Sequence, residues 1–173
     1  MGILLNGSVL GQLENNVWYF SPTNSGILFN FGTNIPSVVT GHSPLTSLHG
    51  CGIDTNPSTG AVMFYTDAVK VFDATNMQMP NGTGLSGGVS CAEKGNIVQI
   101  PGSCNRYYLI TNDANSPTSG NLKYSIVDMN LAGNGSASNP LGDVESATKN
   151  TLITSNSTES FTIVRNPTGS NYW

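Results

Sequence analysis

A glycine-rich stretch near the middle of the chain carries the two patterns that would support nucleotide binding or catalysis. Residues 82–87 fit the G-x-G-x-x-G pattern of dinucleotide-binding loops, and residues 84–88 fit the G-x-S-x-G pattern around a nucleophilic serine, Ser86. Both patterns need a strand before them and a helix after them, the first also an acid about 20 residues on and the second a triad histidine. Residues 88–95 make a poor helix, and residues 103–111 contain no acid. Two overlapping patterns in one glycine-rich loop reflect composition, so we expect no enzyme activity and no nucleotide site.

The two histidines of the chain are the next candidates for chemistry. His42 and His49 both lie in or beside predicted strands. His49 could hydrogen-bond a carboxylate such as Asp67. A lone histidine beside a strand more often bonds within the fold than catalyses, so a structural role is favoured for both.

Two short acidic segments, Asp54-Thr-Asn56 and Asp113-Ala-Asn115, resemble the first ligands of calcium loops. Calcium binds about six to eight oxygen ligands, and an EF-hand loop also needs glycine at its sixth position and glutamate at its twelfth. Neither segment has these residues. Asx turns in hairpin loops are therefore the favoured interpretation. A weak calcium site is the alternative, and no other cofactor is expected.

The cysteines are an odd set: Cys51, Cys91 and Cys104. They contain no C-x-x-C pair, which argues against a zinc site and against a thioredoxin-type redox site. Two interpretations stay open. The three residues are small buried apolar thiols, or two of them form a disulfide and leave one thiol over. The spacing alone does not decide which two would pair.

Aromatic side chains and Asn-containing loops suggest carbohydrate recognition as an alternative role. The aromatic candidates for a sugar-stacking platform are Trp18, Tyr19, Phe20, Tyr65, Tyr107, Tyr108, Tyr172 and Trp173. Because they lie on separate predicted strands, packing between sheets is the favoured interpretation. The N-glycosylation sequons begin at Asn6, Asn81, Asn134 and Asn156. In a chain this rich in Asn, chance explains most of them, and in a glycosylating cell they would mark surface loops.

The composition limits the classes of partner. The chain has 173 residues, enough for one domain with its own core. Charged residues make up 9%, against roughly 25% in ordinary soluble domains, and Asn, Ser, Thr and Gly take over the surface. The formal net charge is −4 without any Lys/Arg cluster, which argues against nucleic acid and anionic membranes as partners. No stretch approaches the about 20 apolar residues of a membrane span, so no membrane insertion is expected.

The expected organisation is a short N-terminal arm or edge strand over residues 1–14, followed by a single all-β domain over residues 15–173. The first residues lack the basic and apolar regions of a signal peptide. Three explanations stay open: a signal that has been removed or replaced, a chain that belongs to a longer one, or a virion protein made in the cytosol and used outside cells.

Short β-branched and aromatic runs alternate with Gly, Pro, Asn and Ser clusters, and helical periodicity is nearly absent. The predicted strands are residues 17–21, 26–31, 37–40, 47–54, 61–66, 69–73, 96–100, 106–111, 122–129, 151–154 and 161–165. The run at 61–66 is almost wholly apolar or aromatic, which predicts a strand covered on both faces. Residues 124–129 mix apolar and alternating patterns, as an outer strand would.

A repeated unit combines a strand, a proline-containing turn and an aromatic strand. It begins at Ile53, returns at Ile97 after 44 residues, and returns at Ile163 after 66. The first spacing is typical of a four-stranded propeller blade. One blade cannot bury its own faces, and a propeller closes with at least about four. We therefore predict two to three antiparallel blades in an incomplete ring, with a β-sandwich as the alternative fold.

An incomplete ring leaves an open aromatic edge, which favours pairing with another strand. The residues expected to form this assembly edge are Phe161, Ile163, Tyr172 and Trp173.

Several segments of the chain resemble, in the same order, segments of a family of large surface proteins. They are residues 16–20, 26–31, 47–51, 60–67, 69–72, 79–85, 107–111 and 122–129. From residue 15 to residue 173 the chain resembles the N-terminal β-propeller-like region of Bacteroidota surface proteins associated with gliding motility and type IX secretion. Residues 79–85 and 124–129 are the most specific segments. The missing signal peptide, the shorter chain, Cys91 and Cys104 depart from the family pattern.

The resemblance implies surface display and adhesion and supplies no catalytic residues. Together with the composition, it predicts a non-enzymatic extracellular structural or adhesive module at a cell or virion surface. Such a module would self-assemble or join a larger assembly, such as a filament or a virion appendage. The alternative is a carbohydrate-binding, lectin-like module whose partners are glycans.

Overall fold

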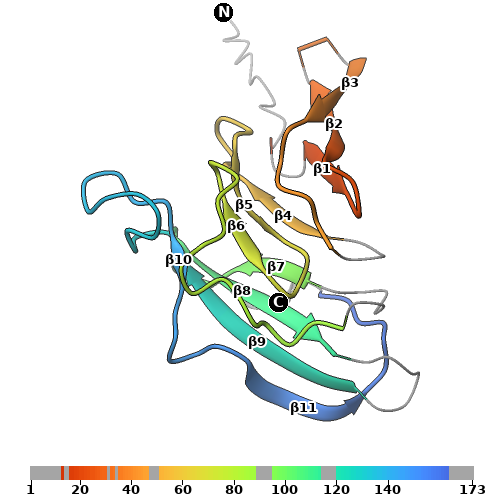
Figure 1. The fold of residues 1–173 in the computed structure, drawn as a ribbon, viewed down its shortest axis with the longest axis vertical. Coiled ribbons are helices and arrows are strands. Elements are labelled where there is room, and N and C mark those ends of the chain that lie inside the picture. The colour runs from red at the N-terminus through yellow and green to blue at the C-terminus, as the bar shows by residue number, and fades with distance from the viewer. Residues whose placement is uncertain are drawn as a thin grey trace, which may run out of the picture.

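The chain is all-β, as the sequence predicts. The computed structural model describes residues 13, 16–30, 32–33, 35–46, 51–88, 95–113 and 120–163. Within these residues every regular element is a β-strand, and the strands form three antiparallel sheets (Figure 1). No helix with the length and apolar character needed to span a membrane occurs in the described part of the chain.

Each sheet is built from strands that follow one another in the sequence. The N-terminal sheet contains β1 (Val17–Phe20), β2 (Ser25–Asn30) and β3 (Ile35–Thr40). The middle sheet contains β4 (Gly52–Thr55), β5 (Val62–Thr66) and β6 (Val71–Asp73). The C-terminal sheet contains β7 (Gly95–Gln99), β8 (Arg106–Asn112), β9 (Gly120–Asp128), β10 (Asp143–Val144) and β11 (Thr151–Ser157). Short turns join most neighbouring strands, which makes each sheet an antiparallel meander.

The C-terminal sheet has four strand positions, because β10 and β11 share one edge of β9. Val144 pairs with Val127, and Thr151 pairs with Tyr124 further along the same strand. Between them, the backbone N–H of Ile126 donates to the hydroxyl of Thr148 at 3.1 Å. The outer strand of this sheet is therefore one strand interrupted by a turn.

The middle sheet has three strands, but an irregular segment occupies its outer edge. Met79 donates its N–H to the carbonyl of Val71, and Val71 donates to the carbonyl of Gly82. Further along, Leu85 donates to Val69 and Gly87 donates to Ala68. Residues 78–87 thus take the position of a fourth strand without forming one.

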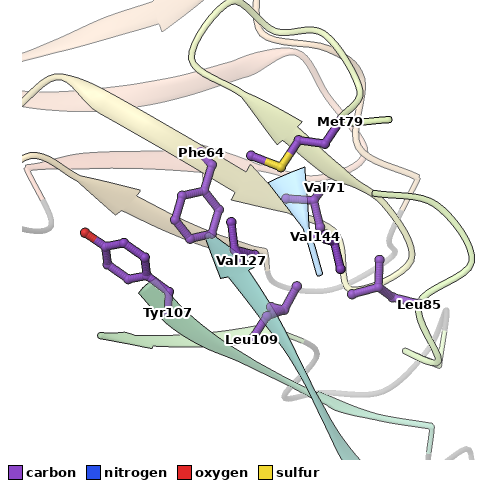
Figure 2. Close-up of a cluster of buried hydrophobic side chains, with 8 residues drawn as sticks. All are labelled: Phe64, Val71, Met79, Leu85, Tyr107, Leu109, Val127 and Val144. Carbon is purple, nitrogen blue, oxygen red and sulfur yellow. The ribbon is translucent and has the colours of Figure 1, made fainter. Parts of the chain in front are cut away.

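The middle sheet is covered on both faces, as predicted from the apolar run at 61–66. Phe64 and Tyr65 are fully buried neighbours on β5 and belong to different clusters. Since successive side chains of a strand point to opposite faces, each lies under a different neighbouring sheet. The cluster shared with the C-terminal sheet consists of Phe64, Val71, Met79, Leu85, Tyr107, Leu109, Val127 and Val144 (Figure 2). The cluster on the opposite face consists of Leu45, Tyr65 and Phe72, with Tyr19, Cys51, Ile53 and Val62 packed against it.

The first strands of the three sheets approach one another. β1 lies beside β4, and β4 lies beside β7 (Figure 1). At the start of β4, a Cβ atom on Gly52 would collide with the carbonyl oxygen of Gly95 at the start of β7. Glycine at position 52 thus allows the backbones of two sheets to touch.

The predicted repeat corresponds to the first hairpin of a sheet. Its copy at Ile53 forms the β4–β5 hairpin, where Ile53 pairs with Tyr65, and its copy at Ile97 forms the β7–β8 hairpin, where Ile97 pairs with Leu109. The copy at Ile163 lies almost wholly outside the described residues.

Other predictions about strands were wrong. Residues 161–163 form no strand, and Phe161 and Ile163 are half-buried rather than part of a sheet edge. Residues 124–128 belong to β9, which has neighbours on both sides and is not an outer strand, and residue 129 lies in the turn after it. β10 is not among the predicted strands, because a two-residue strand has no periodicity to detect. β4 begins at Gly52 rather than at residue 47, and residues 47–50 lie outside the described part.

We predict that Gly52→Ala lowers the free energy of unfolding by about 1–3 kcal/mol, because the added methyl group separates two sheets in backbone contact. Urea unfolding followed by circular dichroism measures the change. Gly32→Ala is the matched control, since its Cβ would meet only the flexible Asn30 side chain, at 3.3 Å. Equal stability of the two variants would contradict the close approach of β4 and β7.

Candidate interaction surface

The N-terminal sheet turns one face toward the middle sheet and the other toward solvent. Val17 is buried, and the ring of Tyr19 packs edge-on against Tyr65 with centroids 5.0 Å apart. Because side chains alternate along β1, Trp18 and Phe20 point away from the middle sheet. Trp18 is 52% exposed and Phe20 is 42% exposed.

Neighbouring strands extend this solvent-facing side. Trp18 pairs with Ile27, which pairs with Val38, so the three side chains share one face. Phe29 meets Trp18 edge-on at a centroid distance of 5.2 Å, and Val38 is 75% exposed. Trp18, Phe20, Ile27, Phe29 and Val38 are called the outer apolar face below.

This face carries no charge of its own. β1, β2 and β3 contain no Asp, Glu, Lys or Arg. Single exposed apolar residues are ordinary, whereas a contiguous apolar patch on one sheet marks an interaction site. The outer apolar face is therefore the candidate functional site of the described chain.

The aromatic cluster under this sheet has a structural role. His42 is 4% exposed and stacks on Tyr19 with centroids 4.0 Å apart. Its Nδ1 lies 2.9 Å from the carbonyl oxygen of Ser43, and its Nε2 lies 3.2 Å from that of Ser25. Both ring nitrogens thus face backbone groups of the fold. His49 lies outside the described residues.

Buried Tyr65 ties the segment after β3 to the middle sheet. Its hydroxyl donates to Oδ1 of Asn76 at 3.1 Å and accepts from the N–H of Ser43 at 2.9 Å. Ser43 also donates its hydroxyl to the carbonyl of Asn76 at 2.6 Å. Burial is the main cause that raises the pKa of Tyr65. Tyr65 and Tyr107 therefore belong to the core, which agrees with the interpretation that these aromatic residues pack between sheets.

The glycine-rich loop, residues 82–88, has a structural role in the fold. Ser86 donates its N–H to Oδ1 of Asn150 at 2.9 Å, and Asn150 donates its Nδ2 to the carbonyl of Gly84 at 2.9 Å. A Cβ atom on Gly87 would collide with Ala68. These glycines let the loop lie tightly against the edge of the middle sheet, and residues 80–88 contain no helix. Both chemical patterns need a strand directly before the loop, and residues 79–81 form none; residues 89–94, where a helix would follow, lie outside the described part.

Buried carboxylates anchor turns. Asp67 is 1% exposed; its Oδ1 accepts from the N–H groups of Val69 and Lys70, and its Oδ2 accepts from the N–H and hydroxyl of Thr46. Hydrogen bonds of this kind are what allow a carboxylate to be buried. The predicted contact between Asp67 and His49 lies outside the described residues.

Two of the predicted glycosylation sites are bonded to such carboxylates. Asn134 donates its Nδ2 to Asp73 at 2.8 Å and to the carbonyl of Gln78 at 2.9 Å. Asn81 donates its Nδ2 to Asp143 at 2.8 Å. A glycan on either amide nitrogen would compete with these bonds.

The remaining sequons differ from these two. Asn156 is exposed and adopts a left-handed φ of 60° in β11, at a position where the pairing register shifts. Asn6 lies outside the described residues.

Described side chains of both candidate calcium segments bond to groups of the same chain. Oδ1 of Asn56 accepts from the N–H groups of Ser58 and Thr59, which is an Asx turn. Asp113 forms an ion pair with Lys123 at 3.2 Å and accepts from Asn121. Burial raises the pKa of Asp113, but the bonds from Asn121 and Lys123 outweigh it and hold that pKa below its usual value.

The second candidate segment is described only at Asp113. Asn115 lies outside the described residues. Among the residues that the structure describes, no three His, Cys, Asp or Glu side chains lie close enough to share a metal ion.

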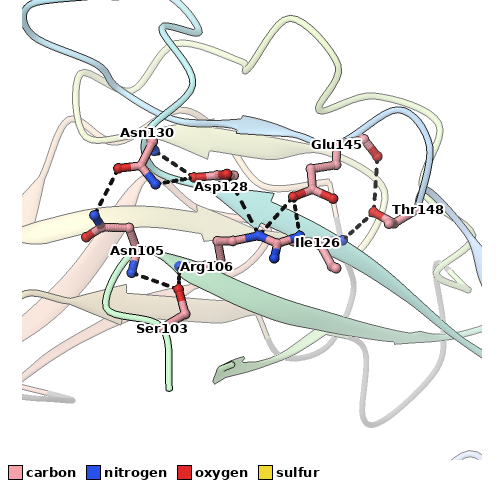
Figure 3. A network of polar contacts seen from close by, with 8 residues as sticks. All are labelled: Ser103, Asn105, Arg106, Ile126, Asp128, Asn130, Glu145 and Thr148. Atoms are coloured by element: carbon pink, nitrogen blue, oxygen red, sulfur yellow. Dashed lines mark hydrogen bonds and ion pairs between the residues drawn. The ribbon is translucent and has the colours of Figure 1, made fainter. Parts of the chain in front are cut away.

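An ion-pair network orders the turn end of the C-terminal sheet (Figure 3). Arg106 donates its Nη2 to Oε1 of Glu145 at 2.7 Å, and its Nε lies 3.8 Å from Oδ2 of Asp128. The hydrogen bond and charge of Glu145 raise the pKa of Arg106. Asn130 donates to Asp128 and accepts from Asn105, which joins the β7–β8 turn to the end of β9. Arg106 is therefore paired with carboxylates of its own chain.

The described cysteines are free thiols in unlike surroundings. Cys51 is half-buried and donates its thiol to the carbonyl of Tyr19 at 3.0 Å, whereas Cys104 is exposed. Burial, with a smaller contribution from the charge of Asp67, raises the pKa of Cys51 to about 11. Cys51 and Cys104 are not bonded to each other, and Cys91 lies outside the described residues.

Comparison with known proteins identifies no relative of this chain. No protein-family model matches it, and neither a curated protein nor a solved structure matches it. The resemblance to Bacteroidota surface proteins rests on the sequence segments alone and stays a prediction.

Sequence reasoning located the exposed surface only in part. It placed the assembly edge at Phe161 and Ile163, which are half-buried, and at Tyr172 and Trp173, which lie outside the described residues. Trp18 and Phe20 were among the aromatic candidates, but Val38 was not. The signal was the run of three neighbouring strands without any charged residue.

We predict that iodoacetamide at pH 8 alkylates Cys104 at least about tenfold faster than Cys51, because the thiolate is the reactive form and a raised pKa suppresses it. Peptide mass spectrometry after timed quenching measures both rates. As the pH rises toward 11, the rate at Cys51 increases steeply. A Cys51 that reacts as fast as Cys104 at pH 8 would show that the thiol is not held in the core.

Proposed function

We propose that this chain is a non-enzymatic structural or adhesive module that assembles, through its N-terminal sheet, with copies of itself or with a larger particle. The observation that carries the proposal is the outer apolar face, on which Trp18, Phe20 and Val38 are 52%, 42% and 75% exposed. The face is uncharged and belongs to a regular sheet, so a second apolar surface can cover it without burying a charge.

The magnitude of the effect favours assembly. Fully burying a large apolar side chain stabilises by about 1.5–3 kcal/mol relative to leaving it in water. Trp18, Phe20 and Val38 leave 52%, 42% and 75% of their surface in water, so covering all three would contribute about 2.5–5 kcal/mol. Association costs about 4–15 kcal/mol in lost translational and rotational freedom, so this face contributes to a larger contact that includes further surface.

The polar residues support the non-enzymatic part of the proposal. The glycine-rich loop bonds to the middle sheet, and the buried carboxylates bond to backbone N–H groups. His42 packs in the aromatic cluster under the N-terminal sheet. In the described residues, therefore, His42 and the buried carboxylates already have structural partners.

The setting we propose is extracellular, at a cell or virion surface. Its support is the low share of charged residues, 9%, with Asn, Ser, Thr and Gly on the surface, together with the family resemblance of the sequence segments. In a filament or virion appendage each copy needs at least two contact surfaces, of which the outer apolar face would be one.

We expect the double variant Trp18→Ser with Phe20→Ser to weaken self-association by at least about tenfold while leaving the fold intact, because both side chains point to solvent. Light scattering coupled to size-exclusion chromatography, over a range of protein concentrations, measures the association. Met77→Ser is the matched control, since Met77 is 59% exposed and lies outside the outer apolar face. A wild-type protein that stays monomeric at every concentration would refute assembly with its own copies.

Carbohydrate binding is the second candidate, and one observation favours it. Trp18 presents half of its surface on β1, in the hairpin whose turn carries the bonded hydroxyls of Thr23 and Ser25. A glycan array, read with and without calcium, tests it. Binding that disappears in Trp18→Ala but persists in Met77→Ala would support a sugar platform, and an array without hits would remove this candidate.

A further inference from the structure

The outer edge of β3 differs from the outer edges of the other two sheets. In the middle sheet residues 78–87 bond to the outer edge, and in the C-terminal sheet β10 and β11 do so. In the N-terminal sheet the strand order ends at β3, and none of the described residues pairs with its far side. Five of the six β3 residues are exposed, with Ile35 at 67% and Val38 at 75%. The strand also lacks the charges that protect open edges.

The pairing with β2 determines which backbone groups of β3 face this open edge. The N–H of Gly41 donates to the carbonyl of Asn24, directly beyond the pair Thr40 and Ser25. In an antiparallel ladder, residues on one strand alternate between bonding to the neighbour and pointing away from it. Residues 35, 37 and 39 therefore bond to β2, and residues 36, 38 and 40 face outward. The outward groups are the N–H of Val38 and Thr40 and the carbonyls of Pro36, Val38 and Thr40.

These outward groups complement a second copy of themselves. If two β3 strands pair antiparallel with Val38 opposite Val38 of the second copy, each Val38 N–H meets the other Val38 carbonyl. Each Thr40 N–H then meets the Pro36 carbonyl of the other copy. Every outward N–H finds an acceptor. Pro36 has no N–H, so the Thr40 carbonyl opposite it receives no hydrogen bond from the second strand and stays with solvent.

A register shifted by two residues fits less well. It would centre on Val39 and form the same number of hydrogen bonds between the two strands, but only residues 38–40 of each strand would overlap. The register centred on Val38 joins residues 36–40 of each strand.

We propose that two copies of this chain associate through their β3 edges, antiparallel and centred on Val38, so that two N-terminal sheets become one continuous six-stranded sheet. This rests on the proposed function, because it specifies how the N-terminal sheet assembles. The two outer apolar faces then join into one surface, with Trp18, Ile27 and Val38 of each copy in a row across it. Absence of charge on β1, β2 and β3 means that no like charges meet across the two-fold axis.

Single cysteines test the register. In a Cys104→Ser background, Val38→Cys brings two thiols together across a hydrogen-bonded pair, where Cα atoms lie about 5.5 Å apart, within the range for a disulfide. Copper-phenanthroline with oxygen removes two electrons and two protons from the thiols, and peptide mass spectrometry identifies the link. Val39→Cys is the matched control, because its two copies would lie roughly 8 Å apart in the proposed register.

The expected result is a covalent dimer for Val38→Cys and none for Val39→Cys. Linkage of Val39→Cys in place of Val38→Cys would overturn the register. If the wild-type protein associates but neither variant links, edge pairing of β3 is refuted while assembly through the outer apolar face stands. If the wild-type protein is a monomer, both the edge pairing and self-assembly fail.

A charge at the two-fold axis gives a second, independent readout. Val38→Lys places two like charges opposite each other and is expected to weaken dimerisation by at least tenfold, and its thermal unfolding should match that of wild type because the side chain points to solvent. Met77→Lys carries the same charge change at an exposed position elsewhere and should leave the dimer intact. Equal association of both variants would refute the edge pairing.

Discussion

The fold depends on the double covering of the middle sheet. Phe64 and Tyr65 are neighbours on β5 and are both fully buried, which is possible only if a partner lies on each face of the strand. The C-terminal sheet covers Phe64 with Tyr107 and Leu109, and the N-terminal sheet covers Tyr65 with Tyr19. Removing either neighbour would expose one of the two clusters. Each of the three sheets therefore depends on its neighbours for its stability.

The few charged residues of the chain reinforce this stack at its connections. Asp67 and Asp73 accept backbone N–H groups of the turns around β6, and Asp143 accepts from Asn81 in the segment that follows. Each bond replaces water that burial has removed, and leaving such a carboxylate without its partners would be costly. The polar chemistry of the described residues thus holds connecting segments in place.

A stack of open sheets leaves an outer face and strand edges that no other sheet covers. The outer edges of the three sheets in this chain, at β3, β6 and β9, are covered to different extents. Residues 78–87 close the edge of β6, and β10 with β11 closes that of β9. β3 has no such cover among the described residues, and its sheet also presents the outer apolar face. The features that suggest a function consequently gather in the N-terminal sheet, and they favour assembly over chemistry.

The sequence by itself determined the class of the fold, the hairpin repeat at Ile53 and Ile97 and the two-sided burial of residues 61–66, because these depend on local periodicity and on turn residues. It also predicted that residues 88–95, after the glycine-rich loop, make a poor helix. Only the tertiary structure decided that β9 is an inner strand, that Phe161 and Ile163 lie outside any sheet, and that Val38 is exposed on an open edge. An apolar strand has the same sequence pattern whether or not a neighbouring segment covers it. Its exposure depends on which distant segments fold against it, and the local sequence contains no information about those segments.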